Sequence, residues 1–236
     1  GPASNEPEVF EKMVLNGANV ARINFSHATI EEREKAVSTV KEVRNKLNTN
    51  IAILYDTKGP EFRNGNLEGD EINLVPGKTI KIVKDKVLGN EERFSVNYPE
   101  VLDNLEVGNI ILLENGLMKI EVIEKEEDFV NCKIISGGVL GNKKSLNVPN
   151  VKLDIPFIND VDYEDIVYAC RHDGDFIALS FVSCKEDVLK VRDILKEQGR
   201  EDIKLISKIE SMTGIENIDE IIEVSDGIMV ARGDLG

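Results

Sequence analysis

The sequence is poor in features that would assign it to some common classes of protein. It has 29 lysines and arginines against 44 aspartates and glutamates, which gives a formal net charge of -15. This balance argues against a nucleic acid or a membrane surface as the main partner, although a local cluster of cations can still bind an anionic substrate. No run of residues is long and apolar enough to span a bilayer, and we recognise no signal peptide.

Cysteine is also scarce. Cys132, Cys170 and Cys184 are odd in number and lack the spacing of a metal site. They fit free thiols in a reducing cytosol, so we expect a cytoplasmic protein. The chain starts at Gly1 without an initiator Met and stops at Gly236, and we expect it to be a piece of a longer protein.

The sequence does contain an alternation of strands and helices, which is interrupted once. Residues 1–61 and 157–236 alternate between buried strands and helices, whereas residues 62–156 hold short alternating runs separated by Gly, Asn and Pro. We therefore predict an α/β domain in two parts, with a small antiparallel β domain inserted between them. The predicted strands of the α/β part are 20–26, 51–55, 176–182, 204–210 and 226–230, and its helices are 7–16, 29–47, 160–171, 184–198 and 215–223.

Local signals fix some of these boundaries and leave the architecture open. Thr29 with Glu32, and Ser183 with Glu186, have the spacing of capping boxes that open helices. Repeated strand–helix units suggest a β/α barrel or a doubly wound sheet, and periodicity does not choose between them. Five strands are too few to close an eight-stranded barrel, which agrees with an incomplete chain.

Charged residues stand at the ends of two of the predicted strands. Lys208 and Glu210 are two residues apart, so they share one face at the end of their strand, and Asp234 follows the end of the next strand. The carboxyl ends of parallel strands meet at one edge of a sheet. Two carboxylates and a lysine at that edge predict a site for a divalent metal with an anion beside it.

Two earlier strands also end in polar residues. Arg22, Asn24 and Ser26 share one face of the first strand, with His27 after it, and Asp56 ends the second strand. Taken singly, each of these side chains is also explained as a turn, a helix cap or a solvated strand end. Their number at one predicted edge favours a functional site.

Four segments carry a resemblance to a known family. Arg22–His27, Asp56–Glu61, Ser207–Glu210 and Ser225–Gly236 together strongly resemble pyruvate kinase, in the right order and along the whole chain. The resemblance implies a (β/α)8 barrel, incomplete here, with a β lid domain inserted at residues 62–156. It also implies phosphoryl transfer from phosphoenolpyruvate to ADP, giving pyruvate and ATP in the last step of glycolysis. The expected cofactors are Mg2+ or Mn2+ and K+, and the family is usually tetrameric.

The resemblance also implies a role for individual residues. Glu210 and Asp234 would bind the divalent metal, and Lys208 would neutralise the phosphoryl group in transit. Arg22 and Arg63 would grip the phosphate as guanidinium forks. Backbone N–H groups at Gly233 and Asp234 would hold the substrate carboxylate. The implied K+ ligands are Asn24, Ser26, Asp56 and Thr57, the implied nucleotide-binding residues are His27 and Lys144, and Glu61 matches members that depend on K+.

Some positions depart from the family pattern, and two other functions remain open. Ser211–Thr213 and Glu114–Gly116 differ from the usual segments, which bears on the rate more than on the type of reaction. A metal-dependent lyase or aldolase acting on phosphoenolpyruvate or pyruvate would also place a Glu and an Asp at strand ends, but would ignore ADP. The chain could also be a non-catalytic fragment with an open barrel edge.

Overall fold

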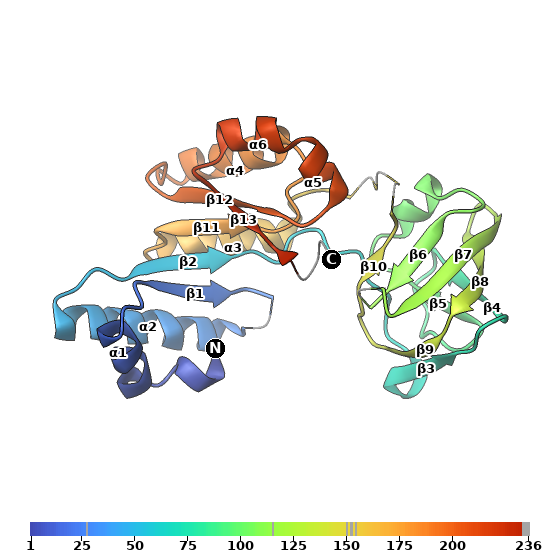
Figure 1. The fold of residues 1–236 in the computed structure, drawn as a ribbon, viewed down its shortest axis with the longest axis horizontal. Helices are drawn as coiled ribbons and strands as arrows, with labels where there is room; N and C mark the ends of the chain where they lie inside the picture. The colour runs from blue at the N-terminus through green and yellow to red at the C-terminus, as the bar shows by residue number, and fades with distance from the viewer. Residues whose placement is uncertain (27, 115, 150, 152, 154, 233–236) are drawn as a thin grey trace. The chain divides into compact units, whose positions relative to one another are not determined.

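The computed structural model describes residues 1–26, 28–114, 116–149, 151, 153 and 155–232. The chain divides into two compact units, which we call the first unit (Gly1–Pro60 with Phe157–Gly236) and the second unit (Glu61–Pro156). Figure 1 shows the α/β elements of the first unit and the β-rich second unit.

The first unit is built on a five-stranded sheet whose strands are all parallel. The strand order is β1-β2-β11-β12-β13. The strands are β1 (Val20–Asn24), β2 (Ala52–Asp56), β11 (Phe176–Leu179), β12 (Lys204–Ile209) and β13 (Gly227–Val230). The helices are α1 (Pro7–Leu15), α2 (Ile30–Leu47), α3 (Asp160–Arg171), α4 (Lys185–Glu197), α5 (Met212–Glu216) and α6 (Ile218–Val224), with a 3-10 turn η1 at Pro2–Ser4.

The strand order answers the question that periodicity left open. Each strand of this sheet pairs with the next strand of the first unit along the chain, with no reversal of direction across the sheet. A doubly wound fold reverses its strand order at a switch point, whereas a β/α barrel winds in one sense. The described part of the first unit is therefore an α/β sheet wound in the manner of a barrel.

Burial and capping explain why these segments form these elements. Ile53, Ile177 and Leu205 are fully buried on neighbouring strands and belong to one core cluster with residues of α2, α3 and α4. Such a sheet, covered by helices, needs nearly continuous apolar strands. Thr29 and Glu32 form the predicted reciprocal capping box at the start of α2. The buried apolar strands leave polar side chains only at their ends.

The structure corrects three details of the prediction. The capping residues of α4 are Cys184 and Asp187, one residue later than predicted, because the Asp187 carboxylate accepts a hydrogen bond from the Cys184 N–H. The same carboxylate also accepts from the Ser183 N–H and hydroxyl. The single helix expected at 215–223 is two helices that meet at Asn217. The first strand ends at Asn24, so Ser26 lies beyond the strand.

The second unit is a small β structure with its own core. Its six-stranded sheet has the order β10-β6-β7-β8-β4-β5, and a two-stranded sheet joins β3 to β9. The strands are β3 (Glu71–Leu74), β4 (Thr79–Val83), β5 (Arg93–Ser95), β6 (Ile110–Leu113), β7 (Met118–Lys125), β8 (Phe129–Ser136), β9 (Gly138–Gly141) and β10 (Leu146–Asn147), with 3-10 turns η2 (Glu68–Asp70) and η3 (Pro99–Asn104). All pairs are antiparallel except β4 with β5, which is parallel.

Among the described residues, no helix is both long enough and apolar enough to cross a bilayer.

Candidate active site

Lys208 lies at the centre of a polar cluster at the carboxyl-terminal edge of the parallel sheet. Its Nζ atom is 3.0 Å from Glu210 Oε1, 3.2 Å from Asp56 Oδ1 and 2.8 Å from Ser180 Oγ. The Lys208 side chain is 11% exposed, and both carboxylate side chains are 1% exposed. An ammonium group this buried is stable only because oxygen atoms surround it. We call Arg22, Asp56, Ser180, Lys208 and Glu210 the strand-end cluster.

Ser180 connects the end of β2 to Lys208 of β12. Its hydroxyl donates to the Thr57 carbonyl at 2.7 Å and accepts from Lys208, and its N–H donates to Thr57 Oγ1 at 3.1 Å. The next residue, Phe181, has φ 58°, in the left-handed region. This conformation directs the Phe181 N–H to Glu210 Oε2, at 2.7 Å. Both oxygens of Glu210 are therefore held, one by the backbone and one by Lys208.

Arg22 gives the cluster its second cation. Its Nε atom donates to Asp56 Oδ2 at 2.6 Å, and its Nη2 atom lies 2.5 Å from the same oxygen. The Arg22 side chain is 54% exposed, in contrast to the buried Asp56. The guanidinium group thus has one side bound to the protein and the other side open to solvent, as a phosphate-binding arginine requires.

Oxygen donors from two adjacent strand ends match the chemistry of a monovalent cation site. Asn24 and Asp56 are direct partners in the register of β1 and β2, and the Phe25 N–H donates to the Asp56 carbonyl. Asn24 Oδ1 accepts a hydrogen bond from the Ser26 N–H at 2.8 Å, and the Thr57 carbonyl accepts from Ser180. An amide oxygen, a hydroxyl, a carboxylate and a main-chain carbonyl are suitable K+ ligands, so the donor set fits the ion.

Three predicted site residues lie outside the described part of the chain. These are His27, Gly233 and Asp234. Glu210 is the described member of the predicted divalent metal pair, and no group of three or more His, Cys, Asp or Glu side chains within the described residues could hold a metal ion. Glu210 therefore stays a predicted ligand whose partner carboxylate is outside the description.

Arg63 and Lys144 belong to the second unit. Arg63 pairs with Glu61 at 2.6 Å and donates to the Lys143 carbonyl. Lys144 Nζ is 2.6 Å from Glu114 Oε1. Both cations are thus held by acidic or carbonyl oxygens of their own unit, and their predicted roles toward phosphate and nucleotide stay predictions.

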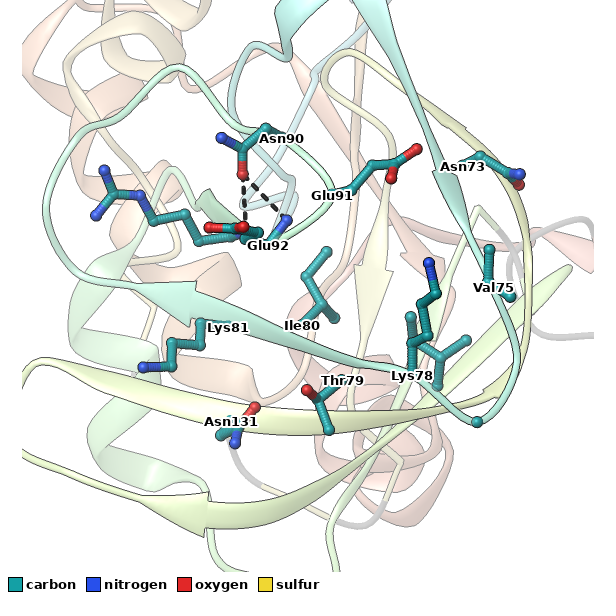
Figure 2. Close-up of a pocket in the computed structure, with 13 residues that line it drawn as sticks. Asn73, Val75, Lys78, Thr79, Ile80, Lys81, Asn90, Glu91, Glu92 and Asn131 are labelled. Carbon is teal, nitrogen blue, oxygen red and sulfur yellow. Dashed lines mark hydrogen bonds between the residues drawn. The ribbon is translucent and has the colours of Figure 1, made fainter.

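The second unit also contains an open hollow of about 790 Å3. Figure 2 shows Ile80 among the polar residues of this hollow, with the Asn90 side chain bonded to the backbone of Glu92 and Arg93. Its lining includes Lys78 and Lys81 near β4, and Glu91 and Glu92 just before β5. None of the predicted site residues that the structure describes lines this hollow.

Ser180 and the Phe181 N–H are groups of the site that were not predicted from the sequence. Ser180 follows the buried strand β11, so the same rule that selected Lys208 and Asp56, a polar residue at the end of an apolar strand, also applies to it. The Phe181 N–H has no such signal, because its direction depends on a backbone conformation that β-region propensities do not predict.

Comparison with known proteins assigns the family. The sequence profile described as "Pyruvate kinase, barrel domain" matches residues 1–236. The chain belongs to the pyruvate kinase family. The chain is 44% identical over 238 residues to a pyruvate kinase of Staphylococcus haemolyticus and 45% identical over 238 residues to one of Staphylococcus epidermidis, in each case over 100% of this chain.

A solved structure of the family agrees with the fold. The crystal structure of a pyruvate kinase from Cryptosporidium parvum matches 100% of this chain with a TM-score of 0.93 and 40% sequence identity. The chain covers 41% and 40% of the two staphylococcal proteins and 50% of the crystallised chain. It therefore spans about half or less of the length of the family members that it matches.

Proposed function

We propose that this chain carries the phosphoenolpyruvate-binding part of a pyruvate kinase, which transfers the phosphoryl group of phosphoenolpyruvate to ADP. The observation that supports this most is the Lys208 ammonium group, buried between Asp56, Glu210 and Ser180 at the carboxyl-terminal edge of the sheet. Family membership supports the same reaction. We further propose the cytoplasm as the location and a homotetramer as the assembly.

The proposed chemistry depends on the placement of charge. Lys208 would neutralise the phosphoryl group in transit, and the open side of the Arg22 guanidinium would hold its oxygens. Glu210, with Asp234, would hold Mg2+ or Mn2+, which supplies positive charge to the phosphate and the enolate oxygen. The described groups are held by hydrogen bonds and ion pairs to one another, so binding of the metal and the phosphate would exchange part of these contacts for contacts to the ligands.

Further parts of the proposal involve residues beyond the strand-end cluster. Asn24, Ser26, Asp56 and Thr57 would hold K+, with Glu61 marking a K+-dependent member. Gly233 and Asp234 would bind the substrate carboxylate through their N–H groups. The first unit would form part of a (β/α)8 barrel, and the second unit would act as a lid that carries Arg63 and excludes water. The residues proposed to bind the nucleotide are His27 and Lys144.

One assay tests the proposal and its competitors. Pyruvate formation from phosphoenolpyruvate is measured in the full-length protein and in this chain alone, with Mg2+, with and without ADP and K+. We expect the full-length protein to require ADP and to be activated by K+. Turnover of phosphoenolpyruvate without ADP would instead support a lyase or aldolase. Activity of the full-length protein alone would identify this chain as a non-catalytic part of the enzyme.

A further inference from the structure

The guanidinium group of Arg33 fastens both ends of the connection between β1 and α2. Arg33 stands in the first turn of α2, and its Nη2 atom donates to the Phe25 carbonyl at 3.0 Å. Its Nε atom donates to the Ala28 carbonyl at 3.1 Å. These two carbonyls flank the segment that includes Ser26, one of the proposed K+ ligands. One side chain therefore binds the backbone next to Ser26 and the backbone just before α2.

Asp165 of α3 holds Arg33 in place. Its Oδ1 atom is 2.5 Å from Arg33 Nη1, and the two side chains are 8% and 12% exposed. The Arg33 guanidinium also lies over the Phe25 ring, 4.2 Å from its centroid. Burial raises the pKa of the Asp165 carboxyl, and the bond from Arg33 opposes that rise. A buried ion pair contributes little net stability, so its value lies in fixing a geometry.

A second buried carboxylate on the same helix reaches the neighbouring loop. Asp162 Oδ1 accepts a hydrogen bond of 3.3 Å from the N–H of Gly59. Gly59 lies three residues after Asp56 in the loop that follows β2. The Phe25 N–H in turn donates to the Asp56 carbonyl at 3.0 Å. The first two turns of α3 thus hold both loops that carry the proposed K+ ligands, and Asp162 and Asp165 are each less than 10% exposed.

We propose that Arg33 and Asp165 are positioning residues that fix the size of the monovalent cation site and so make it prefer K+ over Na+. The inference rests on the proposed function, because it takes Asn24, Ser26, Asp56 and Thr57 as the cation ligands. Two ions of equal charge are distinguished by the size, number and rigidity of their ligand cage. A cage held by the Arg33 fork resists contraction around the smaller Na+ ion, and a cage without the fork loses this resistance.

The experiment compares Arg33→Lys and Asp165→Asn with the unchanged full-length protein. Lysine keeps the charge and the pairing with Asp165 but does not form the planar fork to two carbonyls, so Arg33→Lys is the variant that keeps the fold. Asp160→Asn is the matched control, because Asp160 is an exposed residue of the same helix. The half-saturating K+ and Na+ concentrations are measured twice, from the melting temperature at constant ionic strength and from activation of pyruvate formation.

The expected result is a change in ion preference. Partners behind metal ligands are typically worth 10–100-fold in affinity, so we expect Arg33→Lys to raise the half-saturating K+ concentration about tenfold and to change that of Na+ much less. Asp165→Asn should act in the same direction, and Asp160→Asn should match the unchanged protein. Asp165→Glu keeps the carboxylate, and a K+ preference retained in this variant but lost in Asp165→Asn would support a positioning role.

Two other outcomes overturn the inference and are distinguishable. Variants that melt at a lower temperature but keep the K+ and Na+ concentrations of the unchanged protein would show that the pair is only structural. An unchanged protein that responds equally to K+ and Na+ would remove the K+ part of the proposed function together with the inference.

Discussion

The buried position of Lys208 makes this residue the most sensitive point of the strand-end cluster. Lys208→Met removes the ammonium group with little change in volume, and takes one ion-pair contact each from Glu210 and Asp56. Removing one partner of a buried ion pair costs about 3–5 kcal/mol, so we expect a clear fall in the free energy of unfolding. We also expect the kcat of the full-length protein to fall by about 10²–10³, since a preorganised charge at the reacting group is lost.

Lys208→Arg is the control that separates stability from chemistry. Arginine keeps the charge between the two carboxylates but does not present it as a single point. We expect this variant to recover much of the unfolding free energy, measured in urea, without recovering kcat. A Lys208→Met protein with unchanged kcat would contradict the role given to Lys208.

The pH dependence of folding stability tests the environment of one residue, Asp162. Burial raises the pKa of its carboxyl, while the Asn159 and Gly59 N–H groups lower it by less. Because the folded-state pKa is above the unfolded value, the contribution of Asp162 to stability is greatest below the unfolded pKa and is lost as the pH rises through the folded one. Asp162→Asn lacks this titration, so its stability relative to the unchanged protein should improve between pH 4 and pH 7.

The matched comparison for that experiment is again Asp160→Asn, on the same helix but exposed. It is measured alongside Asp162→Asn and controls for the loss of one carboxylate from α3. Unfolding by urea at each pH gives the required free energies. A constant difference between Asp162→Asn and the unchanged protein would mean that burial does not perturb Asp162.

At the scale of elements, the loop after β2 lies against the end of β11 at Gly59. This glycine has φ 71°, and a Cβ atom added to it would lie 2.8 Å from the Ser180 carbonyl oxygen. Gly59→Ala therefore introduces both backbone strain and a contact with the strand-end cluster. We expect it to cost about 1–3 kcal/mol from strain alone, and more from the contact.

Gly199 supplies the control for Gly59. It has φ 65° in the same unit, and an added Cβ atom would meet nothing within 4 Å. Gly199→Ala should therefore cost only the strain of the positive φ, about 1–3 kcal/mol, with no added cost from a contact. Urea unfolding of both variants measures the difference, and equal costs would show that the approach of Gly59 to Ser180 is unimportant.

The elements also show how far the sequence could take the prediction. Apolar strands with polar ends identified Lys208, Glu210 and Asp56, because burial and the period of two determine these positions directly. The break between α5 and α6 was missed, since Asn217 donates its side-chain amide to the Ser183 carbonyl, 34 residues earlier. A contact so distant in sequence outweighs the helical pattern around it and leaves no local signal.

The same limit applies to the site. Ser180 reaches Thr57, and Arg33 reaches Asp165, through contacts between residues 123 and 132 positions apart. The periodicity of apolar residues does not identify which polar residue of a helix contacts a loop elsewhere in the chain. The strand ends could thus be predicted, whereas the side chains that hold them required the structure.

At the scale of the whole chain, the second unit has a hydrophobic core of its own. Ile82, Phe94, Ile111 and Ile120 are fully buried within one cluster confined to this unit. We predict that residues 61–156 fold alone and unfold in one cooperative transition, measured by circular dichroism and by the dispersion of amide signals in NMR. Absence of a cooperative transition would contradict the prediction.

A core variant makes this test quantitative. Ile120→Ala should cost about 2–5 kcal/mol, because it creates a cavity at a fully buried position. The loss should be the same in the isolated segment and in the second unit of the intact chain. A much smaller loss in the isolated segment would indicate that it folds without its native core.

The strand-end cluster has a consequence for the order in which ligands bind. Its two cations, Arg22 and Lys208, are already neutralised by its two anions, Asp56 and Glu210. An anionic ligand that reaches the cluster first must compete with the protein's own carboxylates for the same guanidinium and ammonium groups. Metal cations that occupy those carboxylates would release Arg22 and Lys208 for the incoming anion. Cation loading would therefore come before the substrate, and titration with phosphoenolpyruvate should show weak binding until Mg2+ and K+ are supplied.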